Sequence, residues 1–374
     1  MGRELPLGRI AGIRIGMDWS VPIIALLYTW ILATDRFPYE QPGLSDTAYW
    51  LAGIAGALLF FASLLAHEVG HAVVARREGI GVHRISLWLL GGLTHLESNA
   101  ETPKAEIRIA AIGPITSAAV GLLCILVDWV VADTGTAGLL GHVFAWVGFL
   151  NLLLAAFNMI PASPLDGGKV LAGIIWSRTG SATGATVTAA RVGMVAGAAA
   201  ATYGIFNLDG GGFGFWLVIV GVFIFTAARR EAMSAPVIAT LEGVTVGQGM
   251  LALPPQAHAD MPVDQFLRTM SRDQPHQAYP VVDHTGTVVA MLTADAIRAV
   301  PPPSWPTLRV RDLAFPLDRV AVVGTSDSLL SAAQKIQGKP SDDAFVVGPD
   351  GRVVGTIGTE TIEWAMRSHQ PAGT

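Results

Sequence analysis

Long apolar runs fill the chain between Trp19 and Ala228, and they constrain its fold more than any other feature. Only 14% of the residues are charged, whereas soluble globular chains have about 25%. A helix needs about 20 mainly apolar residues to cross the hydrocarbon core of a bilayer. The runs therefore predict a polytopic α-helical membrane protein with about six spanning helices, at 19–34, 50–75, 105–132, 139–160, 186–206 and 213–228.

Basic residues gather on one side of the predicted spans, whereas the loops on the opposite side hold acidic residues and Arg36. Because cytosolic loops carry the excess of lysine and arginine, both termini are expected in the cytosol. An even number of spans gives the same orientation. The basic residues assigned to the cytosolic side are Arg3, Arg9, Arg14, Arg76, Arg77, Arg84, Lys104, Arg108, Lys169, Arg178, Arg191, Arg229 and Arg230.

The composition changes near residues 229–231, which predicts two domains. We expect an N-terminal membrane-associated strand at 1–18, a membrane domain at 19–230, a linker at 231–243 and a soluble domain at 244–374. The net charge of −5 without a basic run argues against a nucleic-acid partner. The single cysteine excludes an intrachain disulfide.

Two segments of the membrane half do not fit simple spans. In the N-terminal segment, Ile13 and Ile15 alternate with Arg14 and Gly16, which is typical of a strand. Residues 82–97 are too short to cross the membrane, and a pair of glycines lies between their two apolar arms. The pattern predicts a re-entrant β-hairpin, and the alternative is a surface hairpin without a role in chemistry.

The second predicted span contains the sequence His67-Glu68-Val69-Gly70-His71. On a helix, residues i and i+4 share one face, so both imidazoles can reach one metal ion, and Glu68 can take a proton from water beside it. Three ionisable groups within five residues of a span are costly unless a metal compensates for them. The alternative is a surface helix turn, which the apolar surroundings disfavour.

Zinc hydrolases generally use three protein ligands, and Asp166 is the best candidate for the third. Pro161 and Pro164 should end the preceding helix, and Gly167 and Gly168 allow a sharp turn, so the carboxylate can point inward. The alternative is an aspartate in a cytosolic turn. Asn151 and Asn158 are seven residues apart and share a helical face, where they can serve the site or the substrate, or simply pack between helices.

The chain resembles the site-2 protease family of intramembrane zinc metalloproteases, specifically the bacterial members with C-terminal CBS domains. The resemblance covers nearly the whole chain. It rests on HEVGH, on NMIPASPLDGGKVL at 158–171, on Gly113-Pro114 and on the opening LGRIAGIRI. Asp18 departs from the family pattern, which often has a histidine there. The resemblance implies His67, His71 and Asp166 as ligands of one catalytic Zn²⁺ and Glu68 as the catalytic acid and base.

The resemblance further implies a multi-pass protein of the bacterial cell membrane with cytosolic termini. Its substrate would be a single-pass membrane protein, such as an anti-sigma factor, cut in or near its transmembrane segment in regulated intramembrane proteolysis. The hairpin around Gly91 and Gly92 can receive the unwound substrate as an added strand. Two other classes compete with this interpretation, a CBS-regulated membrane transporter or channel and a catalytically inactive adaptor.

An internal repeat with an offset of 65 residues fills the soluble part, at about 244–300 and 306–370. Residues 286–292 match 351–357, and each copy reads strand, glycine turn, strand, helix. The pair resembles tandem CBS modules, which often bind adenine nucleotides, and Thr293 and Asp295 are the residues nearest to the usual ligand pattern. The alternative is a packing or dimerisation module, which would allow a homodimer through these repeats.

Overall fold

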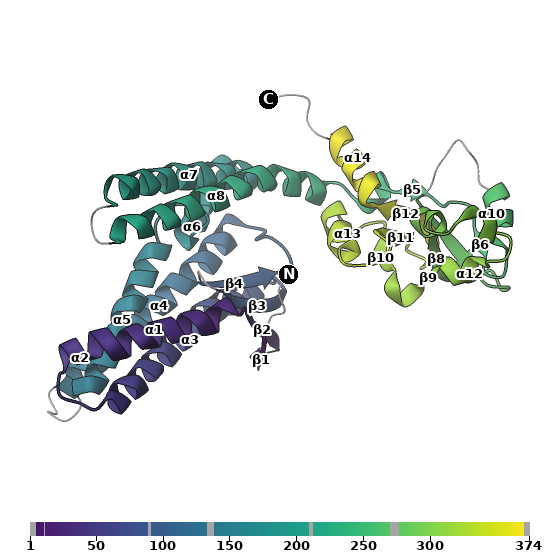
Figure 1. The fold of residues 1–374 in the computed structure, drawn as a ribbon. Helices are drawn as coiled ribbons and strands as arrows, with labels where there is room; N and C mark the ends of the chain where they lie inside the picture. Colours follow the sequence, from purple (N-terminus) through teal and green to yellow (C-terminus); the bar gives the residue numbers. More distant parts are fainter. Residues whose placement is uncertain are drawn as a thin grey trace. The chain divides into compact units, whose positions relative to one another are not determined.

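The computed structural model describes residues 5–10, 12–88, 91–132, 138–208, 212–269 and 277–369. The chain divides into two compact units, Met1–Met233 and Ser234–Thr374. The first contains the apolar helices, and the second contains two small mixed sheets with short helices (Figure 1). This division lies inside the segment that was expected to be a linker.

The first unit consists of helices with one small sheet (Figure 1). Its strands are β1 (Leu5–Ile10), β2 (Ile13–Met17), β3 (Val82–Trp88) and β4 (Gly91–Leu96). Its helices are α1 (Ser20–Ile31), a π-helical segment (Leu32–Arg36), α2 (Phe37–Glu40), α3 (Asp46–Arg77), α4 (Pro103–Ala132), α5 (Gly138–Asn158), α6 (Asp166–Thr179), α7 (Ala182–Phe206) and α8 (Phe213–Gly243). The last of these helices continues into the second unit.

Among the described residues, five helices are long and apolar enough to cross a membrane, and these are α3, α4, α5, α7 and α8. The first predicted span differs in form, because a π-helical segment interrupts the helical stretch from Ser20 to Glu40. The last predicted span also differs, because α8 continues through the expected linker to Gly243. The expectation of a polytopic α-helical membrane domain is confirmed.

Small residues allow the helices to pack closely. A Cβ on Gly121 of α4 would lie 3.0 Å from the carbonyl oxygen of Gly148 on α5. In the same way, a Cβ on Gly197 of α7 would lie 2.6 Å from the backbone nitrogen of Phe225 on α8. Side chains at these positions would push the backbones apart, and close backbone approach is what holds helices together in lipid.

The four strands form one sheet in the order β1-β2-β3-β4, in which β2 and β3 are parallel and the other pairs are antiparallel. The predicted strand at the N-terminus is therefore a hairpin of two strands, and the predicted hairpin at 82–97 pairs beside it. Ile13 and Ile85 are buried in one cluster with Ala72 and Ala75 of α3. The sheet thus lies against the helix that contains the HExxH sequence.

The second unit repeats one arrangement twice. Its elements are α9 (Val246–Gly249), β5 (Leu251–Ala252), β6 (Ala257–His258), α10 (Val263–Thr269), β7 (Ala278–Val282), β8 (Val288–Thr293), α11 (Ala294–Arg298), a 3₁₀ turn (Pro302–Ser304), α12 (Val310–Leu313), β9 (Phe315–Pro316), a second 3₁₀ turn (Leu317–Arg319), β10 (Ala321–Gly324), α13 (Leu329–Ile336), β11 (Asp343–Val347), β12 (Val353–Gly358) and α14 (Thr359–His369).

The strand register reproduces the repeat of 65 residues. Ala278 pairs with Thr293, and Asp343 pairs with Gly358 at the equivalent positions. Both hairpins also have an irregularity at equivalent places, after Val281 and after Val346.

The two repeats exchange their first strands. The sheets have the orders β6-β7-β8-β9 and β10-β11-β12-β5. Strand β5, which precedes the first repeat's hairpin, completes the second sheet, and β9, which precedes the second hairpin, completes the first. The buried core of the second repeat accordingly contains Val244 and Val246 from the start of the first. Neither sheet is complete without residues from the other repeat.

Candidate active site

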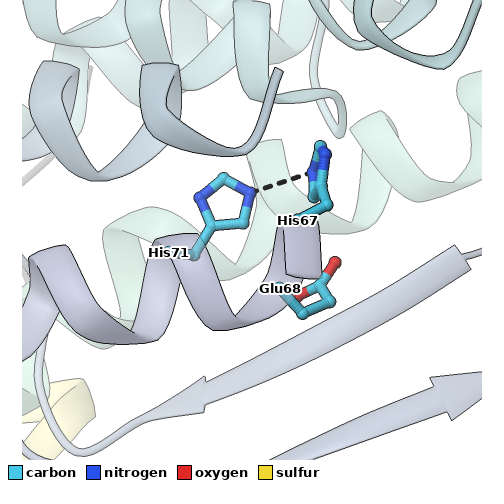
Figure 2. A group of neighbouring side chains, drawn as sticks. All are labelled: His67, Glu68 and His71. Atoms are coloured by element: carbon cyan, nitrogen blue, oxygen red, sulfur yellow. Dashed lines mark hydrogen bonds between the residues drawn. The ribbon is translucent and has the colours of Figure 1, made fainter. Parts of the chain in front are cut away.

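Helix α3 places His67, Glu68 and His71 inside the first unit, where their exposed fractions are 3%, 6% and 8%. The helix begins at a capped end, because the Ser45 hydroxyl accepts a hydrogen bond from the amide of Ala48. Four residues separate the two histidines, so they lie on one face. Figure 2 shows the two imidazole rings approaching each other while Glu68 turns toward a neighbouring strand.

Asp166 joins the two histidines from another part of the chain. It is the first residue of α6, and its side chain is 14% exposed. The carboxylate atom Oδ2 lies 3.2 Å from Nε2 of His67 and 3.4 Å from Nε2 of His71. The two Nε2 atoms are 3.1 Å apart.

These three distances are those of a tetrahedral ligand set. Zinc binds imidazole nitrogen and carboxylate oxygen at about 2.0–2.1 Å, and a tetrahedron with such bonds places its ligand atoms about 3.3 Å apart. The donor types, two neutral imidazoles and one carboxylate, also suit zinc and leave a fourth position for water. The residues therefore fit a catalytic zinc ion.

The local chain path explains how Asp166 reaches this position. Helix α5 ends at Asn158, and the proline-containing segment turns back so tightly that a Cβ on Gly168 would lie 2.4 Å from the backbone nitrogen of Ser163. A Cβ on Gly167 would likewise lie 2.4 Å from the carbonyl oxygen of Ile160. Only glycine fits at these two places. An acidic residue in the first turn is also favoured by the helix dipole.

Each imidazole is oriented by a second contact. Nδ1 of His71 lies 2.6 Å from the carbonyl oxygen of Ile109. Because a carbonyl can only accept, Nδ1 carries the proton, and Nε2 is left as the ligand atom. Nδ1 of His67 lies 2.9 Å from the hydroxyl of Ser117, which is fully buried on α4. The same assignment lets Nδ1 of His67 donate to Ser117.

Glu68 faces the β-sheet. The Thr94 hydroxyl on β4 lies 2.8 Å from Oε2 of Glu68 and 3.2 Å from its carbonyl oxygen, and both are acceptors. A Cβ on Gly92 would lie 2.2 Å from Cγ of Glu68, so only glycine fits beside this carboxylate. Gly91 has a φ of 141°, which L side chains rarely adopt. The hairpin thus holds the glutamate in place.

Helix α4 approaches the two histidines at Gly113 as closely as β4 approaches Glu68 at Gly92. A Cβ there would lie 2.2 Å from Nε2 of His71 and 2.6 Å from Nε2 of His67. The glycine of the Gly113-Pro114 pair is therefore in close contact with the Nε2 atoms of the two histidines. Sequence reasoning missed Ser117, Ile109 and Thr94. Ser117 lies four residues after Gly113 on one helical face, which was the only signal available for it.

The remaining predicted residues lie farther from this cluster or have other partners. Asn151 is fully buried, its amide donates to the Val147 carbonyl at 2.8 Å, and its Oδ1 has no partner among the described residues. Asn158 is half-buried at the end of α5. In the second unit, Thr293 caps α11 through the Ala296 amide, and the exposed Asp295 pairs with Arg298 at 2.9 Å.

The sequence matches the model of peptidase family M50 over residues 55–133 and 128–200, and the CBS domain model over 252–301. "Putative zinc metalloprotease Rip3" of Mycobacterium tuberculosis is 37% identical over 364 residues, which cover 97% of this chain and 90% of that protein. The similarly named sll0528 of Synechocystis is 31% identical and covers 96% of this chain and 94% of that protein.

A solved structure, the Site-2 Protease from Methanocaldococcus jannaschii, is 23% identical, covers 62% of this chain and 95% of that chain, and has a TM-score of 0.42. The class that the relatives define is the intramembrane zinc metalloprotease. This chain belongs to the site-2 protease family, peptidase family M50, and it carries a C-terminal CBS domain. It is accordingly a multi-pass membrane enzyme, a zinc metalloendopeptidase.

Proposed function

We propose that this enzyme hydrolyses a peptide bond in or near the transmembrane segment of a single-pass membrane protein, and that the substrate is a regulatory protein such as an anti-sigma factor. In this proposal His67, His71 and Asp166 hold the zinc ion, and Glu68 is the catalytic acid and base. The observation that supports the proposal best is the close approach of the three ligand atoms, 3.1–3.4 Å apart, beside a buried glutamate.

The chemistry assigned to this chain is proton transfer at a fixed carboxylate. A bound zinc ion supplies Lewis acidity, which lowers the pKa of water and polarises a carbonyl. Glu68 takes a proton from the attacking water and returns it to the nitrogen of the leaving amine, so the C–N bond breaks and one water molecule is consumed. Thr94 holds the carboxylate in the orientation that this transfer needs.

Orientation in the membrane follows from the distribution of charge. We infer that the protein lies in the bacterial cell membrane with both termini in the cytosol, because the cations Arg76 and Arg77 end α3 and the other loops on that side are also basic. His71 lies five residues before Arg76, about 7.5 Å along the helix. Cytosolic water would then need to travel only a short distance to the site.

The second unit is the proposed regulatory element. Members of the CBS class often bind adenine nucleotides, so ATP and AMP are the first ligands to test, with Thr293 and Asp295 as tentative contacts, and a homodimer through this unit is the second proposal. Calorimetric titration of the full chain with each nucleotide tests the first proposal. Absence of heat and of any thermal shift would remove nucleotide regulation, while light scattering would decide the oligomeric state separately.

The assignment of Glu68 is tested by Glu68→Gln. This variant should retain one zinc ion per chain and the wild-type unfolding temperature, but it should lose cleavage, because an amide cannot accept the proton. Glu78→Gln is the matched control, since Glu78 lies just after the same helix and pairs with Arg108 at its exposed end. Zinc is measured by atomic absorption and cleavage by release of fragments from membrane proteins reconstituted with the enzyme.

The substrate class is tested by trapping. The Glu68→Gln enzyme, isolated from membranes, should retain single-pass proteins that disappear when the active enzyme is present. Cleavage of the captured proteins by the active enzyme would support the proposal. A captured set that the active enzyme leaves intact would refute the substrate class, and a Glu68→Gln variant that still cuts would refute the catalytic assignment.

A further inference from the structure

Four basic side chains lie in one row across the membrane-associated sheet. Arg9 is paired with Arg14 across β1 and β2, Arg14 with Arg84 across β2 and β3, and Arg84 with His95 across β3 and β4. Residues directly opposite each other on neighbouring strands project from the same face. We call this set the arginine row. Ile13 and Ile15 alternate with it and are buried, so the row projects from the face opposite to them.

Two members of the row, Arg9 and Arg14, carry unbalanced charge. Arg9 and Arg14 are exposed, lie opposite each other and have no hydrogen-bond or ion-pair partner among the described residues. Two nearby acidic residues are engaged elsewhere, since Glu97 faces His83 at 3.5 Å and Glu78 pairs with Arg108 at 3.0 Å. Like charges directly opposite each other destabilise a sheet. An anion between the guanidinium groups would remove this repulsion.

The position of the row along the strands indicates which kind of anion the row would bind. Arg84 lies near the beginning of β3, which follows the basic end of α3 after a short turn. Four residues further, about 13 Å along the strand, Trp88 is 38% exposed and packs on Phe223, and Leu93 on β4 is 52% exposed. The sheet therefore has a cationic end and an apolar end. This is the polarity of a surface that crosses from lipid headgroups into acyl chains.

We propose that the arginine row binds the phosphate groups of anionic phospholipids in the leaflet at the cytosolic side. Guanidinium groups bind phosphate with paired hydrogen bonds, and the cytosolic leaflet is the anionic one. Exposed apolar side chains lie between the row and the apolar end of the sheet, Leu7 at 51% on β1 and Trp19 at 57% after β2, and in this proposal they contact the acyl region. The inference uses the proposed orientation but not the proposed cleavage reaction.

Lipid binding is measured by native mass spectrometry of the full chain in detergent, titrated with phosphatidylglycerol or phosphatidylcholine. The wild-type protein should bind phosphatidylglycerol preferentially, and Arg9→Gln/Arg14→Gln should weaken this binding by at least about tenfold, because two charge-assisted contacts are lost. Arg178→Gln/Arg191→Gln is the control with the same loss of charge, since both arginines are exposed on α6 and α7. It should bind like the wild-type protein.

Thermal unfolding separates lipid binding from a structural role. Phosphatidylglycerol should raise the unfolding temperature of the wild-type protein but not that of Arg9→Gln/Arg14→Gln, whose unfolding temperature without lipid should equal or exceed the wild-type value because the repulsion is gone. Equal lipid binding by the wild-type and double-variant proteins would overturn the proposal. Equal loss in the control, displacement by millimolar inorganic phosphate, or preference for an acidic peptide over the lipid would do so as well.

Discussion

The hydroxyl of Thr94 links strand β4 to Glu68. It lies within hydrogen-bond distance of both the carboxylate and the backbone carbonyl of Glu68, and this places a strand residue in contact with the residue that we propose moves the proton. Gly92 on the same strand leaves room for Glu68 only because it has no side chain. The orientation of the glutamate therefore depends on β4 as much as on its own helix.

Thr94→Val should lower kcat by about tenfold while KM and zinc content stay near the wild-type values, because the lost contact positions the carboxylate without touching zinc. Thr94→Ser retains the hydroxyl and should restore most of the activity. Steady-state kinetics on a reconstituted substrate measures both variants. A valine variant with unchanged kcat, or a serine variant as impaired as valine, would show that the hydroxyl does not position Glu68.

Helix α4 approaches the proposed metal site with its backbone at Gly113 rather than with a ligand side chain. Gly113 lies so close to both Nε2 atoms that an added methyl group would occupy the space of the histidine ligand atoms. Gly121, two turns further along, lies against Leu152 and the Gly148 carbonyl, far from any ligand. Substituting Gly113 is therefore expected to affect the histidines, whereas substituting Gly121 is expected to affect helix packing, although both glycines belong to one helix.

Gly113→Ala should lower zinc occupancy, measured by atomic absorption after dialysis, because the histidines must move apart. Gly121→Ala should keep one zinc per chain but lower the unfolding temperature by a few degrees, since the contact with α5 is overpacked. If Gly113→Ala bound zinc as well as Gly121→Ala, the close contact at the site would have no role in metal binding.

The elements that sequence patterns identified best are those governed by local rules. Helical spacing brought His67, Glu68 and His71 together, and two prolines followed by two glycines predicted the break that carries Asp166. Ser117 and Ile109 lie 50 and 38 residues from the histidines that they contact. No local rule encodes such contacts. Helix α6 and the π-helical segment were not predicted as separate elements.

At the scale of the whole molecule, the repeat predicted strand, turn, strand and helix in each copy of the tail, and it did not predict the exchange of short strands between the copies. Strands of two residues, such as β5 and β9, leave no periodic signal. The offset of 65 residues nevertheless reproduced the pairing register of both hairpins. The sequence repeat therefore identified the repeating unit, but it did not identify the sheet to which each short strand belongs.

The tail also contains a buried carboxyl group that responds to pH. Burial, reinforced by Asp342, Asp295 and Glu360, raises the pKa of Asp343 to about 7. Because the folded pKa lies above the usual value of 3.8, the folded tail prefers the protonated acid. Asp343 thus imposes no penalty below about pH 4, and stability falls as the pH rises toward 7, where the full penalty is reached.

Asp343→Asn should remove this penalty, since an amide resembles the protonated acid. Hydrogen exchange of the β11 and β12 peptides in the full chain, corrected for intrinsic rates, should show greater protection at pH 8 than in the wild-type protein and a weaker dependence on pH between 5 and 8. Asp318→Asn, an exposed residue, is the control. Unchanged protection in Asp343→Asn would refute the destabilising charge.

The exchange of β5 and β9 between the two repeats has a consequence for folding during biosynthesis. The first sheet of the tail is completed by Phe315 and Pro316 of the second repeat. In the second sheet, Leu251 of the first repeat pairs with Thr356, which is synthesised much later. On the ribosome, the first sheet can therefore close only after Pro316 has emerged, inside the second repeat, and the second sheet can close only after Gly358 has emerged. A chain that stops before Phe315 would leave both sheets incomplete, whereas a chain that stops between Pro316 and Val353 would contain every strand of the first sheet but lack β12 of the second.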